Sequence, residues 1–367
     1  MCIMIDKAQA NPKRIVFPEG DHGKILRACH VLLEEKIAIP VLLGHGDQVQ
    51  KAAADLGVSL DGAVVIDPAT HPRMEEYVQE HYRLRQRKGV SLAVAREQMN
   101  HRSIFSSMMM RMGDADALVS GVTKNYPDIL RPALQIIGVR EGIHKVSGIY
   151  FLITRKGDLY FFADATVDVE PTTEDLAEIV LCTAQEARRF DVEPRIAMLS
   201  FSNFGSSRHP LCDKVRRAVE LVRYADPRLM IDGEVQADFA INAKKLETGF
   251  PFSRLKGGAN VLIFPDLQSC NIAARLITPI RSGRGAGSDS LRRCESRFIC
   301  CNGVRRSRTS STSLLSPWST LRNARRLPKR SRFQPRWPST SVTYLDCAPR
   351  PLPFRGTGWA AFVATTG

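Results

Sequence analysis

Residues 174–206, EDLAEIVLCTAQEARRFDVEPRIAMLSFSNFGS, carry a helix pattern that leads directly into a strand pattern. Over 174–190 the apolar residues recur at helical spacing, acids occupy the first turn and two arginines the last, and Pro171-Thr172-Thr173 supplies an N-cap. The run RIAML then has the pattern of a short buried strand that ends in a Ser-rich loop. This succession of helix, strand and loop predicts an α/β fold.

The same alternation extends over most of the first 277 residues. Because short apolar strands separated by longer helical stretches are typical of a parallel sheet covered by helices, we expect that architecture here. Loops that follow the strands of such a sheet line its ligand cleft. The further strand patterns are RIVFPEG (14–20), IPVLLG (39–44), AVVID (63–67), ADALVSG (115–121) and NVLIFPDLQSCN (260–271), and residues 24–35 are helical in pattern.

Charge is distributed unevenly along the chain. The 367 residues carry a net charge of +14, and residues 281–367 account for all of it, with 16 Arg, one Lys and three acids. A hydrophobic content of 44%, no bilayer-length apolar run and no signal-like N-terminus predict a cytoplasmic protein without membrane contact. Five cysteines before residue 281 are scattered and are expected to be buried thiols rather than metal ligands, namely Cys2, Cys29, Cys182, Cys212 and Cys270.

The residues after 277 lack any sustained periodicity. One interpretation is a basic tail that binds nucleic acid. The other is a shifted reading frame: if each codon starts one base earlier, CNGVRRSRTSSTSLLSPWST (301–320) becomes LQWGATVEDVVNLAAIAVVD with permitted third bases, which has the pattern of an amphipathic helix. We therefore predict a frameshift between about residues 276 and 287 and a disordered or misfolded tail that binds no nucleic acid.

Six blocks of the chain resemble successive blocks of the phosphate acetyl/butyryl-transferase family. They are KRIVFPEG, SGVTKNYPDILRPALQIIG, FADATVDVEPTTEDLAEI, MLSFSNFGSSRHP, DGEVQADFAI and NVLIFPDLQSCNIA, in the family's order. The variant FSNFGSSRHP and the run PFSRLKGGANVLIFPDL are most similar to the C-terminal domain of NADP-dependent malic enzymes, a branch of that family. The decoded LQWGATVEDVVN is similar to the family's next block, which supports the frameshift.

The resemblance implies an α/β, two-domain, three-layer fold similar to that of isocitrate and isopropylmalate dehydrogenases. Residues 1–142 would form the first part of the larger domain, residues 143–277 an inserted smaller domain, and residues 278–367 the out-of-frame tail. Family members are homo-oligomers and need no metal or cofactor. Their ligands are coenzyme A or acetyl-CoA and an acyl phosphate.

The family reaction moves an acetyl group between coenzyme A and phosphate, which requires cations for the phosphoryl oxygens. By resemblance, Arg131 in ILRPALQ is the phosphate-site arginine, and Arg85 in YRLRQRKG is a second arginine near the substrate. A guanidinium offers phosphate a two-pronged donor. For Arg85 the competing interpretation is a solvated basic helix face, because Arg83, Arg87 and Lys88 are its neighbours.

Loops after the strands supply the remaining candidates. Backbone N–H groups at Ser120, Gly121 and Thr123 could bind an anion, although an ordinary turn would have the same composition. The chain has Gln-Ser-Cys-Asn at 268–271 where the family typically has Asp-Ala-Gly-Asn, so an altered loop is expected there. The resemblance places the others at the coenzyme A or phosphate cleft: Ser202, Asn203, Gly205, Ser206, Asp266 and Asn271.

The block that carries catalysis in active transferases is expected to be missing, so we assign no catalytic residue. Those enzymes have a Ser-Arg pair and an Asp six residues later, whereas this chain has Asn302, Gly303 and Thr309, and the decoded frame gives Gln-Trp for the pair. The main interpretation is the detached acetyl-CoA-binding regulatory part of an NADP-dependent malic enzyme, an oxidoreductase, truncated by the frameshift. The alternative is a stand-alone phosphate acetyl/butyryltransferase.

Overall fold

The computed structural model describes residues 2–139, 144, 146–154, 158–164, 167–281, 296–299 and 362–365. These residues form two compact units, one centred on Met1–Arg140 and the other on Glu141–Ser296. Among the helices of these ranges, none is both long and apolar enough to cross a bilayer. Most of the predicted out-of-frame tail lies outside the described residues.

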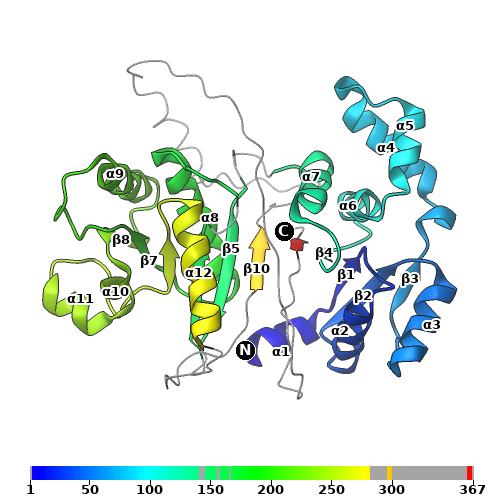
Figure 1. The fold of residues 1–367 in the computed structure, drawn as a ribbon, viewed down its shortest axis with the longest axis horizontal. Helices are drawn as coiled ribbons and strands as arrows, with labels where there is room; N and C mark the ends of the chain where they lie inside the picture. The colour runs from blue at the N-terminus through cyan, green and yellow to red at the C-terminus, as the bar shows by residue number, and fades with distance from the viewer. Residues whose placement is uncertain are drawn as a thin grey trace. The chain divides into compact units, whose positions relative to one another are not determined.

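The first unit is built on a sheet in the order β11-β4-β1-β2-β3 (Figure 1). Neighbouring strands are parallel, except that β11 runs antiparallel to β4. The chain passes from β1 outward to β2 and β3, then returns to β4 on the other side of β1, so the strand order reverses between β1 and β4. Ligands of open α/β sheets bind at the carboxyl ends of the strands beside such a reversal. The strands are β1 (Lys13–Phe17), β2 (Ala38–Leu43), β3 (Val64–Ile66), β4 (Ala117–Ser120) and β11 (Phe362–Thr365).

Helices of the first unit present apolar faces to this sheet. Ile25 and Leu26 of α2 and Val49 of α3 are buried against Phe17 of β1 and Leu42 of β2. Such an apolar stripe, repeated at helical spacing, is what holds an amphipathic helix on a sheet. The helices are α1 (Cys2–Ala10), α2 (Gly23–Glu34), α3 (Gly46–Leu56), α4 (Met74–Arg85), α5 (Leu92–Met99), α6 (Arg102–Met112) and α7 (Tyr126–Ile136), with short 3-10 turns η1 (Pro68–Thr70) and η2 (Gln86–Lys88).

The second unit has a sheet in the order β10-β5-β6-β9-β7-β8, in which β5 pairs antiparallel with β6 and the pairs β6–β9, β9–β7 and β7–β8 are parallel. Helix α8 begins at the predicted N-cap, because Thr172 and Asp175 form a reciprocal capping box. The elements are β5 (Gly148–Ile153), β6 (Leu159–Ala163), α8 (Thr173–Arg189), β7 (Arg195–Leu199), α9 (Pro210–Ala225), β8 (Met230–Val235), α10 (Ala237–Ile241), α11 (Ala243–Gly249), β9 (Val261–Ile263), α12 (Leu267–Arg281) and β10 (Ser296–Ile299).

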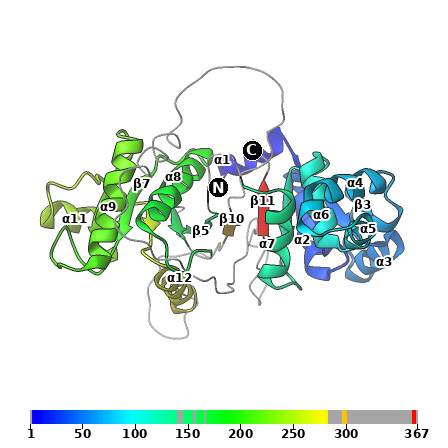
Figure 2. The ribbon, with the colours of Figure 1, turned by 90° about the horizontal axis from the view of Figure 1, so that it is seen from above.

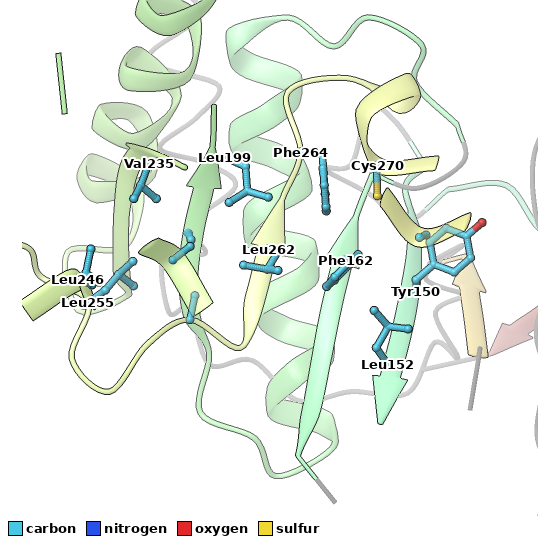
Figure 3. Close-up of a cluster of buried hydrophobic side chains, with 14 residues drawn as sticks. Tyr150, Leu152, Phe162, Leu199, Val235, Leu246, Leu255, Leu262, Phe264 and Cys270 are labelled. Carbon is cyan, nitrogen blue, oxygen red and sulfur yellow. The ribbon is translucent and has the colours of Figure 1, made fainter. Parts of the chain in front are cut away.

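Side chains that alternate along these strands bury both faces of the second sheet. Leu199 and Leu262 belong to the cluster of Figure 3, which also contains Cys270 of α12. On the opposite face the ring of Phe161 lies 6.1 Å from that of Phe190, which follows α8. Figure 2 shows α8 and α9 on one side of the strands and α12 on the other. Complete burial of each such side chain contributes about 1.5–3 kcal/mol.

The structure confirms the predicted α/β class and the strand-helix alternation. The strands at 14–20, 39–44, 63–67 and 115–121 end before the quoted stretches do, because the last residues of these stretches lie in the loops at the carboxyl edge of the sheet. The stretch 260–271 contains β9, a loop and the first turn of α12. The predicted buried thiols are also confirmed for four of the five cysteines, and the side chain of Cys2 lies outside the described residues. Burial raises the pKa of the Cys29 thiol, which keeps it protonated and unreactive.

Candidate functional site

The loop that follows β4 closes around one carboxylate, that of Glu19. Glu19 follows β1, and its side chain is buried, with 6% exposed. Its Oε1 accepts hydrogen bonds from the N–H (2.6 Å) and Oγ1 (2.8 Å) of Thr123, and its Oε2 accepts one from the N–H of Gly121 (2.9 Å). Three longer hydrogen bonds come from Ser120 Oγ (3.2 Å), Val122 N–H (3.2 Å) and Lys124 N–H (3.3 Å).

The predicted anion-binding loop at Ser120, Gly121 and Thr123 is therefore present, and the anion it holds is the chain's own Glu19. A positive φ of 118° at Gly121 lets successive N–H groups converge on one point. Burial disfavours the charged form of Glu19, but hydrogen bonds from Thr123, Gly121 and Val122 outweigh it and lower the pKa of this carboxyl below its usual range. Glu19 thus fixes the loop at the point where the strand order reverses.

Arg131 and Arg85, like the exposed Arg27 and Arg87, have no carboxylate partner among the described residues of the first unit. Arg131 is exposed on α7, the helix that begins directly after the loop held by Glu19. Arg85 is half-buried at the end of α4. Their guanidinium donors are available to an anion. Other arginines of the unit are paired at 2.6–2.8 Å, namely Arg73 with Asp114, and Arg83 and Arg111 with Glu80.

In the second unit the Ser-rich loop after β7 is built around another buried carboxylate, that of Glu234 in β8. Glu234 is fully buried and accepts hydrogen bonds from the N–H of Gly205 (2.7 Å) and from Ser202 Oγ (3.2 Å). Arg216 of α9 forms a forked pair with it, at 3.1 and 3.2 Å. Despite burial, Arg216 and the Gly205 N–H lower the pKa of Glu234 below its usual range.

The same loop is closed by further hydrogen bonds among its predicted residues. Ser206 Oγ lies 3.1 Å from Ser202 Oγ and accepts the N–H of Asn203 at 2.9 Å. The Asn203 side chain donates to Gln236 Oε1 (2.6 Å) and accepts the Gln236 N–H (2.8 Å). All four predicted loop residues are thus brought together around Glu234.

Asp266 and Asn271 lie at the start of α12. The Asp266 carboxylate accepts the N–H of Ser269 at 2.7 Å, so it serves as a helix cap, and Asn271 is half-buried within the helix. Residues 268–271, where an altered loop was expected, are helical in this chain, and a helical position needs no glycine. His209 caps α9 by accepting the Leu211 N–H (3.2 Å).

The candidates thus divide between the two units, and each group lies at carboxyl ends of strands or on helices nearby. Sequence patterns identified the loops but not the carboxylates that organise them, Glu19 and Glu234. The role of Glu19 could have been suspected from its position just after a strand pattern, in FPEG (17–20). The first unit holds Arg85, Ser120, Gly121, Thr123 and Arg131, and the second holds Ser202, Asn203, Gly205, Ser206, Asp266 and Asn271.

Comparison with known proteins identifies the class that this fold and these loops define. Residues 1–284 match the family model described as phosphate acetyl/butaryl transferase, and the chain belongs to that family. The solved phosphotransacetylase of Streptococcus pyogenes superposes with a TM-score of 0.73 at 32% identity, covering 88% of this chain and 95% of that one. The two-sheet α/β fold is therefore the fold of phosphotransacetylases.

Two kinds of relative match this chain at similar identity. The phosphate acetyltransferase of Thermoanaerobacterium thermosaccharolyticum is 39% identical over 305 residues, which cover 79% of this chain and 92% of that protein. The NADP-dependent malic enzyme of Escherichia coli is 35% identical over 278 residues, which cover 75% of this chain but 36% of that enzyme. The identity to the phosphate acetyltransferase is slightly higher than the identity to the malic enzyme.

Proposed function

We propose that the chain is a phosphate acetyltransferase of the stand-alone type, which transfers an acyl group between coenzyme A and phosphate. The observation that carries this proposal is the position of Arg131, which has no carboxylate partner among the described residues and lies on the helix that follows the loop at the strand-order reversal, with Arg85 in the same unit. A guanidinium fork matches two phosphoryl oxygens. Acetyl-CoA and an acyl phosphate are the ligands, and the reaction as proposed uses no metal or cofactor.

In this proposal, each part of the site has a separate task. The coenzyme A thiolate attacks the acetyl carbonyl of acetyl phosphate, the carbon–oxygen bond to phosphate breaks, and the phosphate leaves with both electrons. Arg131 and Arg85 hold the phosphoryl oxygens, so they stabilise the charge that gathers on the leaving group. Glu19 is a positioning residue, because it contacts the loop before α7 and not the reacting atoms.

Turnover in this proposal depends on the block at positions 302–309. The decoded Trp at position 303 requires T as the third base of codon 302, whereas C gives CGG, an arginine codon. With C as this base, the decoded block reads LQRGATVED. It then has the Arg and the Asp of the family's catalytic set, though not the Ser. The chain as translated has Asn302, Gly303 and Thr309 there.

A coupled assay for acetyl-CoA formation from acetyl phosphate and coenzyme A tests the proposal. We expect turnover from the chain in which insertion of one base restores the frame before residue 301. The kcat of the chain as translated should be at least about 10²-fold lower than that of the restored chain, because removal of a single oxyanion or phosphate donor lowers kcat by about this factor. A restored chain without turnover would contradict the proposal.

A second candidate function is the one that the malic-enzyme relatives favour: binding of acetyl-CoA as a regulator, without turnover. The FSNFGSSRHP block and the 35% identity to the Escherichia coli enzyme support it. The assay separates the two candidates, because the regulatory domain would bind acetyl-CoA in calorimetry while neither form of the chain converts acetyl phosphate.

A further inference from the structure

A cavity of about 270 Å³ opens at the carboxyl ends of β2 and β3 in the first unit. It is separate from the loop held by Glu19, because that loop lies at the reversal between β4 and β1, on the other side of the sheet's centre. Ligand pockets have volumes of about 300–1,000 Å³, so this one suits a small ligand or a single chemical group. Its walls are formed by Gly44, His45, Asp67, Pro68, Ala69, Asn100 and Arg102.

Two helices of 11 residues begin at this cavity with no side-chain cap. His45 is the N-cap of α3, and Arg102 is the first residue of α6, whose N-cap is His101. Neither N-cap side chain accepts a hydrogen bond from its helix. The first N–H groups of a helix have no partner within it and carry partial positive charge, so both helix ends favour an anionic acceptor.

The side chains of the cavity wall add donors to these helix ends. Nη1 of Arg102 bonds both carboxylate oxygens of Asp21, each at 3.0 Å. Its Nη2 has no hydrogen bond within the described part of the chain, and it lies 3.6 Å from the point that a Cβ on Gly44 would occupy. Gly44 therefore leaves room beside the guanidinium. Asn100 contributes an amide that can donate two further hydrogen bonds.

The Asp67 carboxylate in the cavity wall already has hydrogen-bond partners on both of its oxygens. Asp67 Oδ1 accepts the Ala69 N–H at 3.0 Å, and Oδ2 lies 2.7 Å from His45 Nδ1. The Ala69 N–H, together with His45 and Arg102, holds the pKa of Asp67 below its usual range. Because Asp67 accepts a hydrogen bond from Nδ1, it orients the imidazole and leaves Nε2 free, and in the imidazolium form Nε2 donates to an anion.

We propose that this cavity is a binding site for a phosphate group, held by Arg102, His45, Asn100 and the N-termini of α3 and α6. The charges that face the group are Arg102 and the Asp67–His45 pair, with Asp21 behind the guanidinium. A tetrahedral dianion accepts hydrogen bonds from several directions, as these converging donors require. The group belongs either to free phosphate or to a phosphate monoester such as the one on the ribose of coenzyme A. The proposal does not depend on acyl transfer.

The test is an NMR titration of the full chain with ¹⁵N-labelled histidine, in which the Nε2 signal of His45 is assigned by its loss in His45→Asn. Inorganic phosphate at constant ionic strength should shift this signal in a saturable way. Asn100→Asp, which places a carboxylate in the cavity wall, should weaken that affinity about tenfold or more. Gln50→Glu on the exposed face of α3 makes the same charge change outside the wall and should leave the affinity within about twofold.

Additional titrations distinguish the two sources of phosphate and the two sites. The affinities of coenzyme A and 3′-dephospho-coenzyme A, read from the His45 signal, are compared with that of phosphate. If coenzyme A binds more tightly than phosphate and this gain is lost without the 3′-phosphate, the ligand is a phosphate monoester. If coenzyme A binds no more tightly than phosphate, the ligand is free phosphate. Arg131→Gln should leave the His45 response unchanged, so failure of the acyl-transfer site would not affect this result. A His45 signal that responds to none of these ligands, or equal affinities in Asn100→Asp and Gln50→Glu, would overturn the proposal.

Discussion

Glu19→Gln is expected to lower the free energy of unfolding of the first unit by about 2–4 kcal/mol. Glutamine keeps the shape of the side chain but removes the charge and turns one acceptor oxygen into a donor. That donor would face N–H groups of the loop after β4, so at least two buried donors would lose their acceptor. The loop would then no longer be fixed at the start of α7.

The pH dependence of the same variant gives an independent check. The folded protein lowers the pKa of Glu19, so the stabilisation is complete above its ordinary pKa of about 4.3 and is lost as pH falls through the lower folded value. Urea unfolding should therefore show the full difference between wild type and Glu19→Gln at pH 7 and a smaller one below about pH 4. Glu97→Gln on the exposed surface of α5 should change stability by at most about 0.5 kcal/mol. Equal stability of Glu19→Gln and wild type would rule out the positioning role.

Glu234→Ala should have an effect of similar size in the second unit, about 2–4 kcal/mol. The carboxylate is fully buried and holds both Gly205 and Arg216, whereas Arg216 is 42% exposed and can return to water. Most of the cost of truncation therefore comes from the Gly205 N–H and the Ser202 hydroxyl, which both bond Oε1 and lose this acceptor inside the protein.

Hydrogen exchange can localise this second effect. The Gly205 amide should exchange at least about tenfold faster in Glu234→Ala, because the hydrogen bond that protects it is lost. Glu220→Ala on the exposed face of α9 is the matched control and should leave both stability and Gly205 exchange unchanged. If Gly205 exchanges at the wild-type rate in Glu234→Ala, Glu234 does not organise the loop.

The elements of the fold were predictable because their signals are local. Helix α8 was predicted from consecutive residues: the N-cap at Thr172, acids in the first turn and arginines in the last turn. Strands such as β7 and β9 are short apolar runs between turn residues. The exact strand ends were less predictable, because strand and loop share the same small apolar residues at the carboxyl edge.

The interior of the candidate site was not predictable, because its contacts join residues far apart in the chain. Glu19 and Thr123 are 104 positions apart, so composition identified a loop of N–H donors but not the acceptor. Glu234 and Gly205 are 29 positions apart and belong to different elements. His45 and Asp67 likewise come together only because β2 and β3 are neighbours in the sheet. Local periodicity carries no information on such pairings.

The role of Arg131 is tested by the KM for phosphate of the frame-restored chain carrying Arg131→Gln, measured with acetyl-CoA. We expect a rise of about tenfold or more in the KM for phosphate, with the KM for acetyl-CoA little changed, because a charge-assisted fork to phosphate would be lost. Arg96→Gln, an equal charge change at an exposed arginine paired with Glu75, should leave both constants unchanged. Equal KM values for phosphate in Arg131→Gln and Arg96→Gln would show that Arg131 does not hold the phosphate.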